Sequence, residues 1–301
     1  RDRSVSRGLG DVYKRQGGYS SCFMHPGQSW FYNRENVYSW LGADESLFAE
    51  DFSELEYKGS WVTDESVLRE LENRCEQKSA DGGLDFTYAV TIQNHMSYTE
   101  EKYGDCACPE VETTAELSPE IQTAVNVYAE GIRDANAMLA ELTEFYSAQE
   151  EPVLLLFFGD HLPYLGDNRQ GYIELGLSAA EIYGGEDPYA AYTAPFLLWC
   201  NEAAAQELDF EAAIEALELP GDGRISACYL GAAVLELCGR GEVSPWFGYL
   251  NEMRRELPIM HGGVFETADG ALTTELSGEQ AQLLSKMRCW AYYKLRYGTV
   301  G

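Results

Sequence analysis

Two adjacent residues at the end of an apolar run could bind a metal ion. Residues 153–168 read VLLLFFGDHLPYLGDN, and Gly159 separates the apolar segment from Asp160 and His161. A turn at the glycine would break strand alternation, so the two neighbouring side chains could converge on one point. Divalent cations accept a carboxylate oxygen together with an imidazole nitrogen. The pair therefore predicts a cation site, with a cap or a core hydrogen bond as the alternatives.

Two more histidines stand where they could contact an anionic ligand. His95 ends the segment TIQNH, which forms a polar tip on an apolar run. His25 opens HPGQSWFYNRENVY, in which Tyr32 and Arg34 follow within a few residues. An isolated histidine at a strand end is more often structural than functional. An aromatic ring beside a guanidinium, however, is what an anionic headgroup pocket requires.

The elements that must position these residues alternate along the chain. Apolar runs of strand length cover 85–95, 151–161 and 193–201, and helical periodicity covers 64–77, 118–147, 203–217 and 224–239. The alternation predicts an α/β fold with a mainly parallel sheet flanked by helices. In such folds ligands bind outside the carboxyl ends of the strands. Two of the three runs end in a histidine there, His95 and His161.

Composition and charge exclude one class of partner. The chain has 301 residues, of which 45% are hydrophobic, so it can form a substantial core. It carries 21 basic and 50 acidic residues, a formal net charge of -29. We therefore expect no nucleic-acid partner. An anionic substrate would have to be captured locally, by a bound cation and a few arginine or histidine side chains.

Several other residues have structural interpretations. Asp64 follows a threonine and precedes an apolar-periodic stretch, so we expect a helix N-cap or first-turn acid. Trp30, Trp40 and Trp61 are expected to be core anchors. Arg133 and the aspartate after it lie inside a long helical stretch, where a solvated or packing ion pair is the default.

The order of the motifs resembles that of a known family. HPGQSWFYNRENVYSWLGADESLF, WVTDESVL, VTIQNHMSY, FFGDHLPYL and APFLLW follow one another over residues 20 to 265. This order is similar to the extracellular catalytic domain of the lipoteichoic acid synthase family. The resemblance implies a sulfatase-like fold of the alkaline-phosphatase superfamily and the activity of a phosphoglycerol transferase.

The resemblance also implies roles for individual residues. Asp160 and His161 would ligate a single divalent cation, usually Mn²⁺, with Mg²⁺ as an alternative. His95 would lie near the transferred phosphate as a catalytic and substrate-binding residue. Tyr32 and Arg34 would bind the glycerol-phosphate group together with the histidine that opens the block, His25. Tyr32 stands where many members have tryptophan, which puts the headgroup preference in doubt.

The first residues and the last residues are interpreted separately. Residues 1–16, RDRSVSRGLGDVYKRQ, resemble the translated adapter read-through of assembled reads, with a genuine basic arm as the alternative. Residues 17–265 would then be an N-terminally truncated catalytic domain, and 266–301 a tail whose helix packs on it. In the family, the nucleophilic threonine and a metal-binding glutamate precede residue 17. We therefore expect the printed chain to be inactive.

The implied activity moves glycerol phosphate from a membrane phospholipid to an acceptor. The donor would be a phosphatidylglycerol-like lipid, and the acceptor a glycan or glycerol-phosphate polymer of the cell envelope. The catalytic domain would face the outside of the cell, anchored by N-terminal membrane helices that this chain lacks. Two alternatives remain, a sulfatase or phosphodiesterase of the same fold and a noncatalytic relative that binds glycerophosphate.

Overall fold

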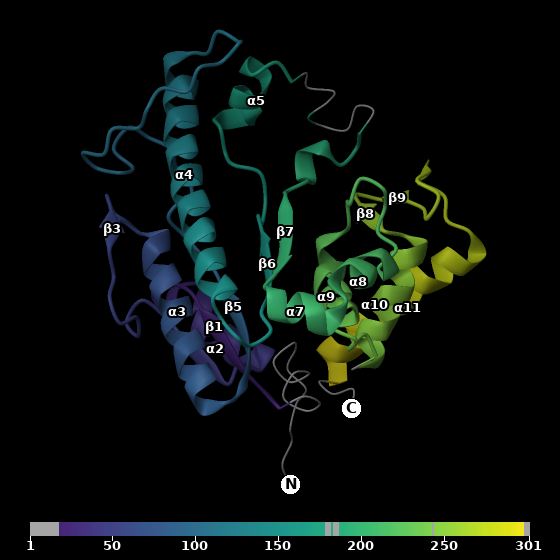
Figure 1. Ribbon diagram of the computed structural model, residues 1–301. Helices are drawn as coiled ribbons and strands as arrows, with labels where there is room; N and C mark the ends of the chain where they lie inside the picture. Colours follow the sequence, from purple (N-terminus) through teal and green to yellow (C-terminus); the bar gives the residue numbers. More distant parts are fainter. Residues whose placement is uncertain (1–17, 178–181, 183–186, 243, 298–301) are drawn as a thin grey trace. The chain divides into compact units, whose positions relative to one another are not determined.

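A computed structural model describes residues 18–177, 182, 187–242 and 244–297 (Figure 1). The predicted leader, 1–16, lies outside these residues. The chain divides into two compact units, one that ends at Asn201 and one that begins at Glu202. Each unit has hydrophobic clusters of its own.

A parallel three-stranded sheet lies at the centre of the first unit. Strand β1 (Tyr19–Met24) pairs in parallel with β2 (Glu45–Leu47) on one side and with β5 (Leu84–Ala89) on the other. Met24 lies opposite both Leu47 and Ala89, so the three strands end at one edge. His25 follows β1 directly at this edge. The predicted parallel sheet with flanking helices is confirmed.

The side chains of β1 alternate between two helical layers. Cys22 and Met24 pack with Val67 of helix α3 (Asp64–Asp81), while Phe23 packs with Tyr38 of helix α2 (Arg34–Leu41). This burial on both faces explains why the last three residues of the strand, Cys22 to Met24, are all apolar. Figure 1 shows helix α4 (Pro119–Ser147) beside α3. The two helices also form a hydrophobic cluster with strand β6 (Leu154–Phe158). Its members are Leu68, Met138, Leu142, Leu155 and Phe157.

Two further strands of the first unit form an antiparallel pair. Strand β6 (Leu154–Phe158) runs antiparallel to β7 (Phe196–Cys200), so these two apolar runs do not extend the parallel arrangement. Asn201, which is 2% exposed, fixes this pairing. Its side-chain oxygen accepts the N–H of Val153 at 3.0 Å, and its amide group donates to the carbonyl of Glu151 at 2.8 Å. The end of β7 is thereby tied to the start of β6.

Short elements complete the first unit. The hairpin of β3 (Tyr57–Lys58) and β4 (Trp61–Val62) precedes α3. Thr63 caps α3 by accepting the N–H of Ser66, so Asp64 is a first-turn acid, one of the two roles expected for it. The other short helices are η1 (Phe31–Asn33), η2 (Asp167–Arg169), α5 (Gln170–Glu174) and η3 (Ala190–Tyr192).

The second unit is mainly helical. Its helices are α7 (Glu202–Leu208), α8 (Phe210–Ala216), η4 (Ala227–Tyr229), α9 (Leu230–Leu237), α10 (Pro245–Glu256) and α11 (Gly278–Tyr297), with strands β8 (Ile259–His261), β9 (Val264–Glu266) and β10 (Leu272–Thr273). Leu283 of α11 packs against Tyr229 and Leu250 in one core. The expected boundary at residue 265 falls inside β9. No described helix has the length and apolar character needed to cross a bilayer.

Candidate functional site

Asp160 and His161 present two donor atoms to solvent after β6. The carboxylate oxygen Oδ2 of Asp160 lies 3.4 Å from Nε2 of His161, and the side chains are 82% and 66% exposed. Oδ1 of Asp160 accepts the backbone N–H of His161 at 2.9 Å. Nδ1 of His161 lies 2.9 Å from the carbonyl oxygen of Leu162, so it carries the proton. Oδ2 and Nε2 are therefore the two atoms left free to bind a ligand.

This donor pair fits a divalent cation. A metal-binding histidine usually donates its other ring N–H to a carbonyl or carboxylate, as His161 does to Leu162. The exposure of both side chains excludes a core hydrogen bond. Within the described ranges, no group of three or more histidine, cysteine, aspartate or glutamate side chains could hold a metal. Asp160 and His161 would thus supply part of a coordination shell.

His25 and Arg34 meet around Gly27. A side chain at Gly27 would lie 3.0 Å from the His25 ring and 3.1 Å from Nη1 of Arg34. His25 is 6% exposed, and burial, with the charge of Arg34, lowers its pKa to about 4. Its Nδ1 accepts the N–H of Gly27 at 2.9 Å, so the proton of the neutral ring is on Nε2. His25 is therefore a neutral donor at pH 7.

An exposed aromatic turn precedes Arg34. Tyr32 is 80% exposed, and the Arg34 guanidinium lies 5.7 Å from its ring centroid. Tyr32 and Asn33 both have a φ of 57°, a left-handed conformation that is costly for tyrosine and easier for asparagine. Trp30 and Trp40 are 66% and 61% exposed, so their prediction as core anchors is wrong. The aromatic rings of residues 30–32 pack on one another instead.

His95 lies in a loop, six residues beyond the last residue of β5. The predicted strand over 85–95 is shorter because the polar residues before His95 bind the helices. Gln93 is 1% exposed; its amide group donates to Asp134 of α4, and its oxygen accepts the N–H of Asp64 at 2.9 Å. Asn94 accepts the O–H of Tyr103 at 3.3 Å. These two anchors leave His95 exposed to solvent.

Two lysines near this loop, Lys58 and Lys102, were not singled out from the sequence. Lys58 of the hairpin forms ion pairs with Glu130 at 2.8 Å and with Asp134 at 2.6 Å. Arg133 pairs with Glu130, and Asp134 pairs with Lys58, so both residues form ion pairs as expected. Lys102 is a buried lysine beside His95. The signal that could have indicated an ordered loop here is the TIQNH motif with the two tyrosines that follow it, Tyr98 and Tyr103.

The Asp160 carboxylate affects the pKa values of two tyrosines, Tyr88 and Tyr98. Burial raises the pKa of Tyr88 at the end of β5, and the Asp160 carboxylate raises it further. The same carboxylate contributes to the raised pKa of Tyr98, after burial as the main cause. Tyr98 donates to the carbonyl oxygen of Asn94 at 2.9 Å. The end of β6 thus lies near the end of β5 and near the loop of His95.

The predicted residues form two contacting groups and one separate residue. Arg34 contacts Tyr32 and surrounds Gly27 with His25, and Asp160 contacts His161. Within the part of the chain that the structure describes, no hydrogen bond or ion pair joins these groups to each other or to the His95 ring. The meeting of all six residues at one site therefore remains a prediction.

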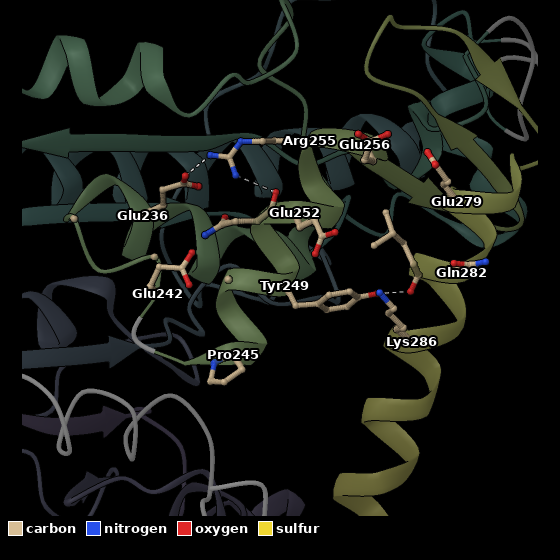
Figure 2. A pocket seen from close by; sticks show the side chains of 15 residues that line it. Glu236, Glu242, Pro245, Tyr249, Glu252, Arg255, Glu256, Glu279, Gln282 and Lys286 are labelled. Atoms are coloured by element: carbon tan, nitrogen blue, oxygen red, sulfur yellow. Dashed lines mark hydrogen bonds and ion pairs between the residues drawn. The ribbon is translucent and has the colours of Figure 1, made fainter.

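An open hollow in the second unit has the wrong charge for an anionic ligand. It has a volume of about 940 Å³ between α9, α10 and α11 (Figure 2). Its acidic lining consists of Glu236, Glu242, Glu252, Glu256 and Glu279. Arg255 at its rim is already paired with Glu236 and with Glu218. The candidate site for a phosphate or sulfate group is therefore in the first unit.

Curated relatives have low identity and are much longer than this chain. One, from Rhizobium meliloti (strain 1021), is named for cyclic beta-1,2-glucan modification and is 26% identical over 230 residues, 76% of this chain and 33% of its own length. The capsular polysaccharide biosynthesis protein RkpI of the same strain is 24% identical over 156 residues, half of this chain and a quarter of its own length. The chain thus spans a third or less of these relatives.

Solved structures share the fold. Streptococcus pyogenes phosphoglycerol transferase GacH, solved with sn-glycerol-1-phosphate, gives a TM-score of 0.62 at 19% identity, over 94% of this chain and 64% of that chain. The lipoteichoic acid synthase LtaP of Listeria monocytogenes gives 0.56 at 15% identity, over 97% and 74%. A Vibrio parahaemolyticus protein of the alkaline phosphatase superfamily gives 0.55 at 13% identity, over 100% and 72%.

The family follows from the sequence match. A family model described as Sulfatase matches residues 3–239, which is most of the chain and includes every predicted site residue. This match agrees with the sulfatase-like, alkaline-phosphatase-superfamily fold implied by the motifs. The chain belongs to the sulfatase family.

Proposed function

We propose that this protein is a metal-dependent phosphoglycerol transferase. The observation that carries the proposal is the convergence of Oδ2 of Asp160 and Nε2 of His161, 3.4 Å apart, with the other polar atom of each side chain engaged. The exposed Tyr32 and the half-buried Arg34 beside His25 support a site for the glycerol-phosphate group. The fold likeness to GacH, whose structure holds sn-glycerol-1-phosphate, supports the same ligand class.

The cation site is proposed to hold Mn²⁺, or alternatively Mg²⁺. Asp160 and His161 would hold the ion, with further ligands from outside the described residues. When bound, a divalent cation stabilises negative charge on a phosphoryl oxygen and lowers the pKa of a coordinated hydroxyl.

The residues of this chain would bind and orient the phosphate group. The Arg34 guanidinium can donate to two nonbridging oxygens as their charge increases. His25 is neutral at pH 7 and can donate from Nε2. Nδ1 of His95 lies 2.8 Å from the carbonyl oxygen of Met96, so Nδ1 carries a proton and Nε2 is the ring nitrogen left for a ligand. In the neutral ring Nε2 would accept a hydrogen bond from a ligand hydroxyl, and in the imidazolium it would donate to a phosphate oxygen. Well-placed donors such as those of Arg34 and His25 are each worth about 3 kcal/mol of transition-state stabilisation.

The remaining parts of the proposal follow the motif order. The nucleophile is proposed to be a threonine that precedes the HP block in the complete protein. The donor is proposed to be a phosphatidylglycerol-like lipid and the acceptor a glycan or glycerol-phosphate polymer. The catalytic domain is proposed to lie on the extracellular face of the membrane. The match to the sulfatase family favours one second candidate, a hydrolase of sulfate or phosphate esters.

Turnover by the full-length protein tests the proposal. We expect Mn²⁺-dependent release of diacylglycerol from labelled phosphatidylglycerol. We expect no hydrolysis of a chromogenic aryl sulfate to sulfate and the coloured phenol. Asp160→Asn and His95→Gln should each lower the lipid turnover by about 100-fold or more. Asp81→Asn, at an exposed position in the last turn of α3, is the matched control and should leave the rate unchanged.

Sulfate release without lipid turnover would establish the hydrolase instead. Activity of the printed chain alone would show that the nucleophile is one of its own residues. Unchanged turnover in Asp160→Asn would remove the role of the Asp160–His161 pair.

A further inference from the structure

A buried lysine lies behind the loop that carries His95. Lys102 is 5% exposed, and its ammonium donates to the carbonyl oxygen of His95 at 2.5 Å. In the part of the chain that the structure describes, no ion pair involves this lysine. A buried cation without a counter-ion is costly, and burial lowers the pKa of Lys102 to about 8.

Aromatic rings surround the ammonium in place of a carboxylate. Nζ of Lys102 lies 3.8 Å from the ring centroid of Trp61, 5.0 Å from that of Tyr103 and 5.8 Å from that of Tyr98. Each contact is within the range of a cation–π interaction, which becomes stronger when the cation is desolvated. The lysine is thus held between three rings and directed at one backbone carbonyl.

The indole of Trp61 contacts the lysine and the histidine together. Its ring stacks on the His95 imidazole with centroids 5.7 Å apart and an interplanar angle of 27°. Trp61 therefore limits the direction of the imidazole, while Lys102 holds the backbone of the same residue. Lys102 therefore restrains the main chain of His95, and Trp61 restrains its ring.

The hairpin that carries Trp61 is fastened at two other points. Lys58 binds Glu130 and Asp134 of α4. Gly59 has a φ of 62°, and a side chain there would lie 2.2 Å from the carbonyl oxygen of Lys102. Only glycine allows the hairpin to approach the loop so closely. Trp61 is thus presented to His95 from a fixed support.

We propose that Lys102 and Trp61 are the positioning residues of His95. They hold its backbone carbonyl and its ring so that Nδ1 donates to the carbonyl oxygen of Met96 and Nε2 is left for the ligand. The proposal rests on the proposed function for the identity of the ligand. The positioning itself depends only on the contacts of Lys102, Trp61 and His95.

Imidazole NMR of the printed chain tests this directly, because the chain has four histidines. In the unaltered chain, the ¹⁵N shifts of the neutral His95 ring should report a proton on Nδ1. In Lys102→Met they should report a mixture of tautomers, while the shifts of His25 and His161 stay in place. The Kd for sn-glycerol 1-phosphate, titrated by the same signals, should rise about 10-fold, as expected for the loss of one hydrogen bond between the ligand and Nε2 of His95.

Conservative variants separate positioning from general damage. Lys102→Arg keeps a cation that can stack on Trp61 and donate to the carbonyl, so it should restore the Nδ1 tautomer. If Lys102→Met does not fold, as judged by circular dichroism, Trp61→Leu removes the stacked ring from the hairpin and should give the same mixture. An unchanged His95 spectrum in the folded variants would overturn the proposal. The variants could show the tautomer mixture while the unaltered chain does not bind sn-glycerol 1-phosphate. That result would support the positioning of His95 and refute the proposed function.

Discussion

Asp64→Asn should raise the free energy of unfolding by about 2–4 kcal/mol at pH 8. Asp64 is 2% exposed, and one of its carboxylate oxygens, Oδ1, is buried without a hydrogen-bond partner. Burial, together with the charge of Asp134, raises the pKa of Asp64 from 3.8 to about 7. An asparagine keeps the shape and carries no charge to desolvate.

The pH dependence of this gain gives a sharper test than its size. Below about pH 3, under the ordinary aspartate pKa of 3.8, the aspartate is protonated in both the folded and the unfolded chain, so the variant should gain little. As the pH rises from about 4 to about 7, the unfolded chain releases the proton that the folded chain keeps, and the unaltered protein loses stability. The advantage of Asp64→Asn should therefore grow over this range and then level off.

Urea unfolding at pH 4.5 and pH 8 measures the effect. Asp81→Asn, in the exposed last turn of the same helix, is the control and should change the stability by less than about 0.5 kcal/mol at either pH. A gain in stability that is equal at both pH values would mean that folding does not raise the pKa of Asp64.

Gly131→Ala should destabilise the protein by about 1–3 kcal/mol, although alanine normally favours a helix by about 1 kcal/mol over glycine. Gly131 is a buried residue of α4. A methyl group there would lie 2.2 Å from Oδ1 of Asn94 and 2.6 Å from the hydroxyl oxygen of Tyr103. The alanine would therefore displace the side chain that anchors the loop of His95, and the affinity for sn-glycerol 1-phosphate should fall as well.

A glycine in another helix supplies the matched control. Gly248 of α10 has only the flexible tip of the Glu242 side chain near its position, at 3.1 Å. Gly248→Ala should therefore stabilise by up to about 1 kcal/mol. Thermal unfolding of both variants measures whether each substitution stabilises or destabilises the protein. Stabilisation by Gly131→Ala would show that the loop does not pack against α4 in the way described.

The regular elements could be predicted because each follows from a local pattern. Helices expected over 64–77 and 118–147 are present as α3 and α4, since an apolar stripe defines each, and the Thr63 cap begins α3 while Pro119 begins α4. The three apolar runs all contain strands. Each strand is shorter than its run because polar residues at the run ends bind neighbouring elements, as Gln93 binds Asp134.

The surroundings of the site could not be predicted because they depend on residues far apart in the sequence. Gly131 meets Asn94 across 37 positions, and Lys58 meets Asp134 across 76. Asn201 at the end of β7 binds Glu151 before β6, across 50 positions. Trp30 and Trp40 show the same limit, since their residue type favours a core and their tertiary position exposes them.

Binding of Mn²⁺ to the printed chain, followed by paramagnetic broadening of the histidine NMR signals, tests the proposed cation site most directly. The titration should be made at about 0.15 M ionic strength, which screens diffuse attraction to a surface of net charge -29. We predict that the His161 signals broaden first, that Mg²⁺ reverses the broadening, and that Asp160→Asn abolishes it. Equal broadening of His161 in the unaltered chain and in Asp160→Asn, or no broadening of His161 at all, would contradict the account.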